Sequence, residues 1–224
     1  MIRVNVIAEG QTEETFVRDI LAPEFGTKEI FFTARSVETS RSKSRIYRGG
    51  LLDYEKAKKD ILRWLKQDKE AVVTTMFDLY ALPDSFPGKK ENKKIIDPYK
   101  LVSILEERFF EDINSETECE KRFIPYIQLH EFEGLLFSDV EKIHEVMKVK
   151  TDERSKLVEI SEKFNNPELI NQGSDTAPSK RLSNLYPGYD KITNGAIIAS
   201  KIGLSEIRRK CSHFNEWLSK IESL

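Results

Sequence analysis

Carboxylate side chains and one imidazole are crowded where three apolar runs of the sequence end. The runs and the groups that follow them are, in chain order, residues 4–8 with Glu9, residues 71–77 with Asp78, and residues 123–129 with His130, Glu131 and Glu133. Acids at the end of a strand repel one another and lose hydration, and a divalent cation, usually Mg²⁺ or Mn²⁺, normally offsets that repulsion. The spacing therefore predicts a divalent-metal site.

Glu13 follows Glu9 by one helical turn, so both carboxylates can face the same side. Each also has an ordinary structural explanation. Glu9 can cap the next helix, and Glu13 is favourable in its first turn because the helix dipole attracts negative charge there. Asp78 is harder to explain in this way, because a lone acid beside a buried strand needs a partner.

Glu131 and Glu133 lie two residues apart, so only a strand-like or turn geometry aims both at one point. If a helix starts at Glu131, only one of them is a ligand. His130 can bind a metal or transfer a proton, and a half-buried structural histidine is the alternative. The many oxygen donors favour Mg²⁺ or Mn²⁺ over zinc, since no cysteine or second histidine is nearby in the sequence.

A serine-rich basic stretch is the first candidate for contacts with phosphates. Its cations are Arg41, Lys43, Arg45 and Arg48. We expect a flexible loop that binds nucleic acid through these side chains. A solvated loop with no ligand explains the composition equally well.

A second basic element lies in the carboxyl-terminal third of the chain. Pro178 begins a predicted short helix and places Lys180 and Arg181 at its N-terminus. Backbone amides and cations at such a position suit a phosphate or the charge that develops on it during reaction. We therefore count both cations among the candidate catalytic residues.

The elements that position these residues alternate between strands and helices. Strands are predicted over residues 4–8, 30–37, 72–77 and 123–129, and helices over 12–21, 53–67 and 99–110. This order implies parallel strands with right-handed crossovers, whose carboxyl ends share one edge of the sheet. Further helices are predicted at 143–147, 152–164, 195–202 and 205–218. We expect an α/β core over residues 1–140 and a helical part over 141–224 packed on it as one globular unit.

The composition excludes several classes of protein. The 224 residues are 39% hydrophobic and 33% charged, with a formal net charge of −2, which is typical of a folded soluble protein. A polyanion would have to meet a local basic patch, because the overall field is weak. Two cysteines without metal-finger spacing indicate reduced thiols. No signal peptide and no apolar run of ~20 residues is seen, so we expect a cytoplasmic protein.

The acidic corners resemble those of a known group of enzymes. Glu9-Gly10 after the first strand and Asp78 after a later one resemble the Toprim domain of topoisomerases, primases and overcoming-lysogenization-defect nucleases. The chain looks most like the Toprim-related "domain of unknown function" family 4276. The matching segments are residues 9–13, 77–78, 86–88, 130–139 and 176–181, and the resemblance spans nearly the whole chain.

The resemblance implies a Toprim-like parallel sheet of about four strands, with a helical C-terminal extension. It also implies Mg²⁺-dependent cleavage of phosphodiester bonds in nucleic acid, DNA or RNA including tRNA. Glu9 acts in proton transfer or metal binding, Asp78 holds metal, and Glu13 matches the second acid of the nuclease branch. Toprim expects a further aspartate where this chain has Tyr80, so Glu131 or Glu133 must supply that ligand.

The same analogy implies a role in prokaryotic anti-phage defence beside an ABC-type ATPase. Tyr80 also supports a different class of function, a non-catalytic regulatory or binding subunit of an ATPase complex.

Overall fold

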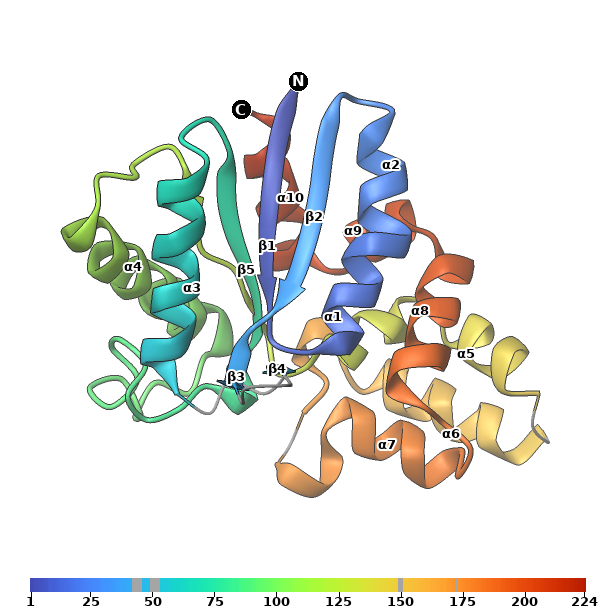
Figure 1. The fold of residues 1–224 in the computed structure, drawn as a ribbon. Coiled ribbons are helices and arrows are strands. Elements are labelled where there is room, and N and C mark those ends of the chain that lie inside the picture. The colour runs from blue at the N-terminus through green and yellow to red at the C-terminus, as the bar shows by residue number, and fades with distance from the viewer. Residues whose placement is uncertain (42–45, 49–52, 149–150, 172) are drawn as a thin grey trace.

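The computed structural model describes residues 1–41, 46–48, 53–148, 151–171 and 173–224 (Figure 1). Its centre is a parallel sheet in the order β2-β1-β5-β6, with β7 also paired to β5. The strands are β1 (Ile2–Ala8), β2 (Ile30–Ser36), β5 (Val72–Asp78), β6 (Phe123–Ile124) and β7 (Ile127–Gln128). The α/β architecture and the parallel sheet expected from the sequence are confirmed.

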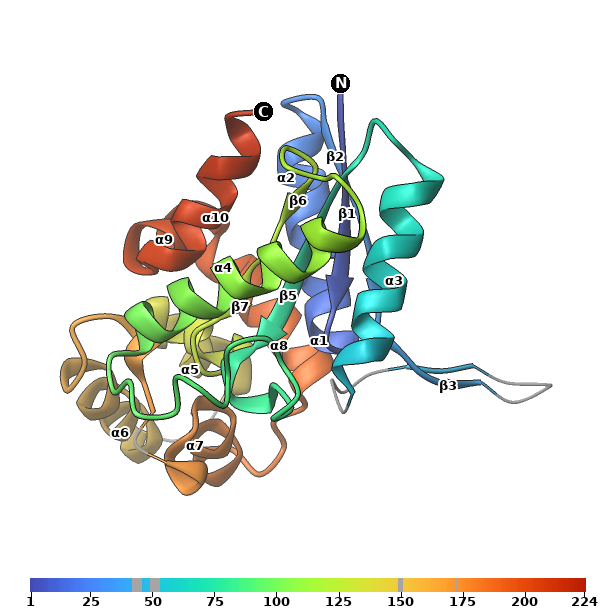
Figure 2. The same ribbon diagram turned by 90° about the vertical axis from the view of Figure 1, so that its left-hand side faces the viewer.

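Helices cover both faces of this sheet, as parallel sheets require. One face meets α1 (Gln11–Phe16), the π-helical turn η1 (Val17–Leu21) and α2 (Ala22–Gly26), together with α10 (Ser212–Glu222). The other face meets α3 (Tyr54–Gln67) and α4 (Pro98–Glu116). Figure 2 shows α10 and α3 on opposite sides of β1 and β5.

Four of the remaining helices gather at the carboxyl edge of the sheet (Figure 1). They are α5 (Val140–Met147), α6 (Thr151–Glu162), α7 (Pro178–Leu185) and α8 (Lys191–Ile202), with short 3₁₀ turns η2 (Leu79–Ala81), η3 (Phe132–Ser138), η4 (Pro167–Leu169) and η5 (Ser174–Thr176). Helix α9 (Leu204–Lys210) lies beside α10 (Figure 2). Within the described residues, no helix is both long enough and apolar enough to span a membrane.

The carboxyl-terminal helices share a core with the sheet. Phe16 of α1 lies 5.2 Å from Phe132 and 5.9 Å from Phe214, measured between ring centroids. Trp217 stacks on Tyr126 at 4.3 Å. Burial of such large aromatic side chains is worth several kcal/mol. The helical part and the sheet therefore pack as neighbours around one apolar cluster.

The prediction of one continuous strand over residues 123–129 is wrong. It is broken into β6 and β7 because Pro125 has no N–H to donate to the ladder. Thr75 bridges the break with its side chain, since Oγ1 donates to the carbonyl of Tyr126 at 2.9 Å and accepts from its amide at 3.0 Å.

The first helix also differs from expectation. It starts at Gln11 behind Gly10, not behind Thr12, and continues past Leu21 to Gly26 through the turn η1. In that turn the Ala22 amide donates to the carbonyl of Val17, one residue further back than in an α-helix. Pro23 follows at once and has no N–H to donate within the helix.

Three other boundaries were wrong. The stretch expected as a flexible basic loop contains an antiparallel pair, β3 (Glu38–Arg41) with β4 (Ile46–Arg48). Helix α4 runs six residues beyond 110, to Glu116. The helix predicted over 205–218 is split by Cys211, whose extended backbone separates α9 from α10. The carboxylate of Glu168 then accepts the first free amides of α10, from His213 at 3.1 Å and Phe214 at 2.9 Å.

Candidate functional site

Glu9 and Asp78 meet at the carboxyl edge because their strands are neighbours. The β1–β5 register aligns Ala8 with Met76, and the Glu9 amide continues it by donating to the Met76 carbonyl at 3.0 Å. The Asp78 amide in turn donates to Glu9 Oε2 at 3.0 Å. Two acids that are 69 residues apart in the sequence are thereby held side by side.

Glu13 joins them from the first turn of α1. It is only 6% exposed, and its Oε2 accepts the Gly10 amide at 2.9 Å. A Cβ atom on residue 10 would stand 3.3 Å from that oxygen, so glycine leaves room for the carboxylate. The adjacent Glu14 points elsewhere, because its Oε2 accepts from the amide of Ser36 at 3.0 Å and from its hydroxyl.

The segment after β7 brings in two more carboxylates. Glu131 has an extended backbone and Glu133 lies in the first turn of η3, and the charges of both raise the pKa of Asp78. The Phe132 amide between them donates to Asp78 Oδ1 at 3.1 Å. Glu131 Oε2 accepts the Ser179 amide at the start of α7, at 3.0 Å.

Lys191 is the cation of this cluster, and the sequence analysis did not identify it. It is the first residue of α8, and its Nζ lies 3.3 Å from Glu133 Oε1. A lysine that follows the helix cap Asp190 is ordinary in a sequence. No local pattern distinguishes it, because its partner is 58 residues earlier in the chain.

The charges in this cluster, which we call the acid cluster (Glu9, Glu13, Asp78, Glu131, Glu133 and Lys191), are poorly balanced. Burial and then the charges of Glu9 and Glu13 raise the pKa of Asp78 well above its usual range. Burial raises the pKa of Glu9 as well. Burial, with the charge of Glu9, raises the pKa of Glu13 to about 7.

Glu133 shows the same imbalance in spite of its lysine. Burial raises its pKa to about 7, although Lys191 acts in the opposite direction. Burial alone would lower the pKa of Lys191, but the charges of Glu133, Glu131 and Asp78 outweigh it and raise that pKa. A buried carboxylate needs more positive charge or more donors than the described residues give it here.

Two buried polar atoms beside this cluster have no hydrogen-bond partner among the described residues, Glu133 Oε1 and the hydroxyl of Tyr189. The contact from Glu133 to Lys191 is therefore an ion pair without a well-directed hydrogen bond. Burial, and then the charge of Glu133, raises the pKa of Tyr189. Buried groups of this kind usually have a ligand, an ion or water as partner.

The donor set fits a hard divalent cation, but the side chains do not converge on one point. Among the described residues, no three or more His, Cys, Asp or Glu side chains stand close enough together to hold a metal ion. The oxygen-only ligands, the raised carboxyl pKa values and the Glu133 oxygen that has an ion pair but no hydrogen bond still suit Mg²⁺ or Mn²⁺.

His130 lies next to the cluster in an unusual backbone conformation, with φ of 62°. Its Nδ1 is 3.2 Å from the side-chain nitrogen Nδ2 of Asn171, which donates to the neutral tautomer that carries its proton on Nε2. Burial lowers the pKa of His130, while the charge of Glu131 acts against that shift. A neutral imidazole can accept a proton, and its role stays a prediction.

The two cations predicted at the start of α7 are placed differently. Arg181 is occupied, because its Nε donates to the Thr176 carbonyl at 2.6 Å and its guanidinium lies 5.9 Å from the ring of Phe164. Lys180 is exposed to solvent. The amide of Ser179 already has the carboxylate of Glu131 as partner, so a phosphate would have to compete for it. Their catalytic role remains a prediction.

The remaining predicted residues are the four cations of the basic stretch and Tyr80. Arg41 and Arg48 belong to the paired strands β3 and β4, and only their backbone is described. Lys43 and Arg45 lie outside the described residues. Tyr80 is 56% exposed in the turn after Asp78, where its amide donates to the carbonyl of His130 at 3.3 Å.

Comparison with known proteins gives the chain a family. The domain of unknown function DUF4276 matches residues 8–222, which is almost the entire sequence. The chain belongs to the DUF4276 family. A search among curated proteins finds no match.

A solved structure has the same fold as this DUF4276 protein. It is the C-terminal region of the Burkholderia pseudomallei OLD protein, with a TM-score of 0.50 and 14% sequence identity over 100% of this chain and 98% of that one. At such low identity the likeness shows the fold alone, a Toprim-like α/β fold with C-terminal helices. The predicted membership of the DUF4276 family and the predicted α/β fold with C-terminal helices are confirmed.

Proposed function

We propose that this DUF4276 protein is a nuclease that cleaves phosphodiester bonds with Mg²⁺ or Mn²⁺. The observation that carries the proposal is the acid cluster, in which five carboxylates from three strand ends face one lysine. A divalent cation is the usual way to stabilise such a concentration of negative charge. The resemblance of Glu9-Gly10 and Asp78 to the acidic corners of Toprim nucleases supports the same class of chemistry.

The described side chains suggest distinct roles. Glu9, Glu13, Asp78 and Glu133 would hold the cation, while Glu131 has one oxygen committed to the Ser179 amide. The bound cation would supply a water of lowered pKa and neutralise charge on the phosphate.

Two groups beside the carboxylates would handle protons and phosphate charge. His130, kept neutral by burial, is placed to accept a proton next to Glu131. Lys191 would turn from Glu133 to the phosphate once the cation relieves the carboxylate.

The substrate is nucleic acid, either DNA or RNA, including tRNA. We further propose, from the resemblance to overcoming-lysogenization-defect nucleases, that the protein is an effector of anti-phage defence and works with an ABC-type ATPase. Nothing in the described residues bears on that partner directly, so its test is co-purification with the ATPase.

A cleavage assay with matched variants tests the nuclease. Plasmid DNA and total tRNA are incubated with Mn²⁺ and the wild type, Glu13→Gln or Glu14→Gln. The two glutamates are neighbours in α1, but only Glu13 points into the cluster. Loss of cleavage in Glu13→Gln alone is expected, by roughly 10²-fold or more for a group that stabilises reaction charge. Equal cleavage by both variants would remove Glu13 from the site.

The alternative, a non-catalytic subunit of an ATPase complex, also has an observation in its favour. Several carboxylates of the cluster fasten backbone segments together, as in the bonds from the amides of Asp78, Phe132 and Ser179. Tyr80 in place of an aspartate agrees with that role. A purely structural cluster would show no stabilisation by Mn²⁺ and no cleavage by any variant.

A further inference from the structure

On its face of the sheet, α3 does not reach over the outer half formed by β1 and β2, and no other described helix covers that half. On the side of α3, alternate residues of β1 are Arg3, Asn5 and Ile7, of which only Ile7 is fully buried. On β2 the same side carries Phe31 and Arg35, both exposed. Parallel sheets are normally covered on both faces, so an open half with exposed polar and aromatic residues needs an explanation.

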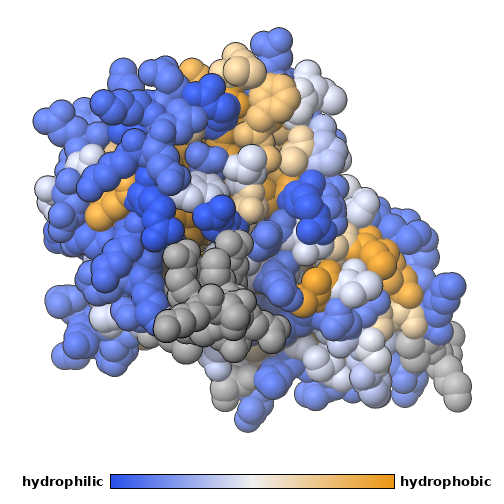
Figure 3. Space-filling view, in the orientation of Figure 1, coloured by the Kyte–Doolittle hydropathy of each residue, from blue (hydrophilic) through white to orange (hydrophobic). Residues whose placement is uncertain are grey.

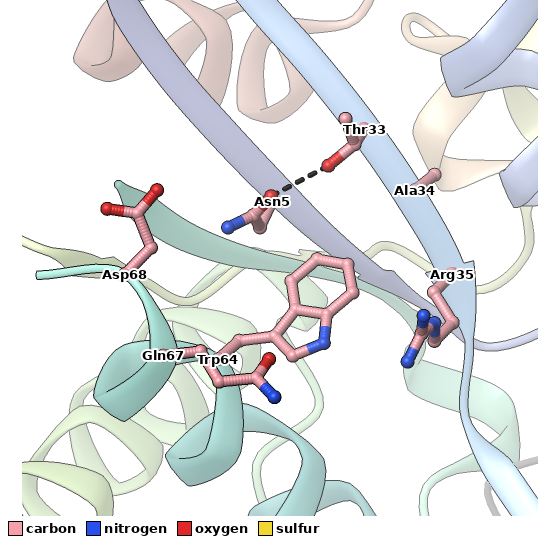
Figure 4. Close-up of a pocket in the computed structure, with 7 residues that line it drawn as sticks. All are labelled: Asn5, Thr33, Ala34, Arg35, Trp64, Gln67 and Asp68. Atoms are coloured by element: carbon pink, nitrogen blue, oxygen red, sulfur yellow. Dashed lines mark hydrogen bonds between the residues drawn. The ribbon is translucent and has the colours of Figure 1, made fainter. Parts of the chain in front are cut away.

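A cavity lies on this open face, between the strands and the edge of α3 (Figure 4). Its volume is about 290 Å³, at the small end of the roughly 300–1,000 Å³ typical of ligand pockets. The residues that define it are Asn5, Thr33, Arg35, Trp64, Gln67 and Asp68. Thr33 Oγ1 donates to Asn5 Oδ1 at 2.7 Å, which fixes the amide at the cavity wall.

The cavity combines an aromatic surface with a cation. The guanidinium carbon of Arg35 lies 5.5 Å from the ring of Trp64, and Trp64 is only half-buried. Trp217, the second tryptophan, is 2% exposed in the core. Figure 3 shows apolar surface over the upper part of β2, beside the hydrophilic surface of α3.

The charge of this face is positive. Asp68 is neutralised by Arg3, with two hydrogen bonds of 2.9 Å, and this pairing lowers the pKa of the carboxyl to about 2. Arg35, by contrast, has no carboxylate partner among the described residues. Helix α3 carries five cations and two acids. Since Lys58 pairs with Asp112 and Glu116 of α4, and Arg63 pairs with Asp60, the positive charge of this face rests on Arg35. A polyanion is therefore attracted here in spite of the overall charge of −2.

We propose that this face binds single-stranded nucleic acid, with a base stacked on Trp64 and a phosphate at Arg35. The inference rests on the proposed nuclease function and adds that the substrate reaches the site as a single strand. Sheet surfaces with exposed aromatic rings bind single strands because every base has a face that stacks. A paired base keeps its faces inside the duplex, so a double strand is a poor ligand.

The position of the face agrees with delivery to the acid cluster. The β1–β2 register aligns Arg35 with Ile7, two residues before Glu9. Asn5 is four residues before Glu9, a distance of roughly 13 Å along a strand. Phe31 offers a second stacking position on β2, four residues before Arg35. A strand lying on this face runs along β1 and β2 toward the carboxyl edge.

Fluorescence anisotropy with labelled oligo-dT and oligo-U tests the proposal on the full chain in EDTA. Trp64→Ala is expected to weaken binding of at least one of them by roughly 5- to 150-fold, the effect of losing one stacked base. Trp64→Phe keeps an aromatic ring and should bind within a few-fold of wild type. Arg35→Ala should lower the salt slope of binding by about 0.7 for one lost phosphate contact.

Controls separate this site from general effects. Arg209→Ala removes another exposed arginine, from α9, and should leave the affinity and the salt slope unchanged. Thermal unfolding of each variant verifies folding, and the Trp64→Phe result remains interpretable if Trp64→Ala is unstable. Wild-type affinity in Trp64→Ala, equal affinity for a duplex, or no binding of either oligonucleotide by wild type would overturn the proposal.

The assay also keeps the two proposals apart, since binding in EDTA needs no cleavage. Binding lost in Trp64→Ala but no Mn²⁺-dependent cleavage by wild type would support the binding face and contradict the nuclease. Cleavage by wild type with unchanged oligonucleotide affinity in the Trp64 variants would support the nuclease and contradict the binding face.

Discussion

Replacing Glu133 by glutamine should stabilise the metal-free protein, although Glu133 is 1% exposed and paired with Lys191. Its pKa of about 7 lies above the ordinary value of 4.5. The folded state therefore holds the proton more tightly than the unfolded chain, and stability falls as the pH rises from about 4.5 to 7. Each tenfold change in proton affinity is about 1.4 kcal/mol, so the ionised carboxylate lowers the free energy of unfolding by roughly 3 kcal/mol above pH 7.

The stability gained by Glu133→Gln should not exceed the free energy lost when this carboxyl ionises. Glutamine still buries a polar amide, and Lys191 loses its closest carboxylate, although it is half exposed and retains the field of Glu131 and Asp78. We expect Glu133→Gln to be more stable than wild type by about 1–3 kcal/mol at pH 8. For a chain of this size, each kcal/mol raises the melting temperature by roughly 2–4 °C.

Thermal unfolding in EDTA at about pH 5 and pH 8 measures the effect. The wild type and Glu133→Gln should melt at similar temperatures at the lower pH and separate at the higher one. Glu168→Gln is the matched control, because Glu168 is also 1% exposed but accepts the amides of His213 and Phe214. That variant should lose roughly 1–3 kcal/mol. A similar loss in Glu133→Gln would show that its carboxylate is satisfied and would refute the reasoning.

Two further predictions concern metal and pH. Mn²⁺ at a hundred times its dissociation constant should stabilise wild type by about 2.7 kcal/mol, seen as a melting-temperature rise that is reduced in Glu9→Gln; an unchanged wild type would contradict metal binding. Burial disfavours the charged form of His213, but the bond to Glu106 and the charge of Glu168 outweigh it and raise its pKa. The extra stability of wild type over His213→Gln should therefore be complete below about pH 6.5 and disappear as the pH rises through the raised value, as denaturant midpoints would show.

Much of the sheet could be predicted because its signals are local. Continuous apolar runs bounded by acids or glycine identify β1 and β5, and both have the predicted positions within a few residues. Parallel order followed from the alternation with helices. The break at Pro125 was readable from the missing N–H, but the compensation by the side chain of Thr75 was not, because the two are about 50 residues apart.

The candidate site was only partly predictable, for a related reason. The acids could be proposed from their places at strand ends, since the carboxyl ends of parallel strands share an edge. Lys191 could not, because a lysine at the start of a helix is common and its charge matters only where α8 packs against η3. The engagement of Ser179 by Glu131 likewise depends on the packing of α7 against η3. The open face beside Trp64 was not predicted, because it depends on how far α3 reaches across the sheet.

By itself, the sequence determined β1, β2 and β5 and the acids that follow β1 and β5, because strand propensity, burial and chain direction are local properties. Only the tertiary structure decided which acids share one environment, which cation accompanies them and which face of the sheet stays open. Those outcomes depend on contacts between segments far apart in the chain, as in the pairing of Glu133 with Lys191, and on how far one helix reaches across its sheet.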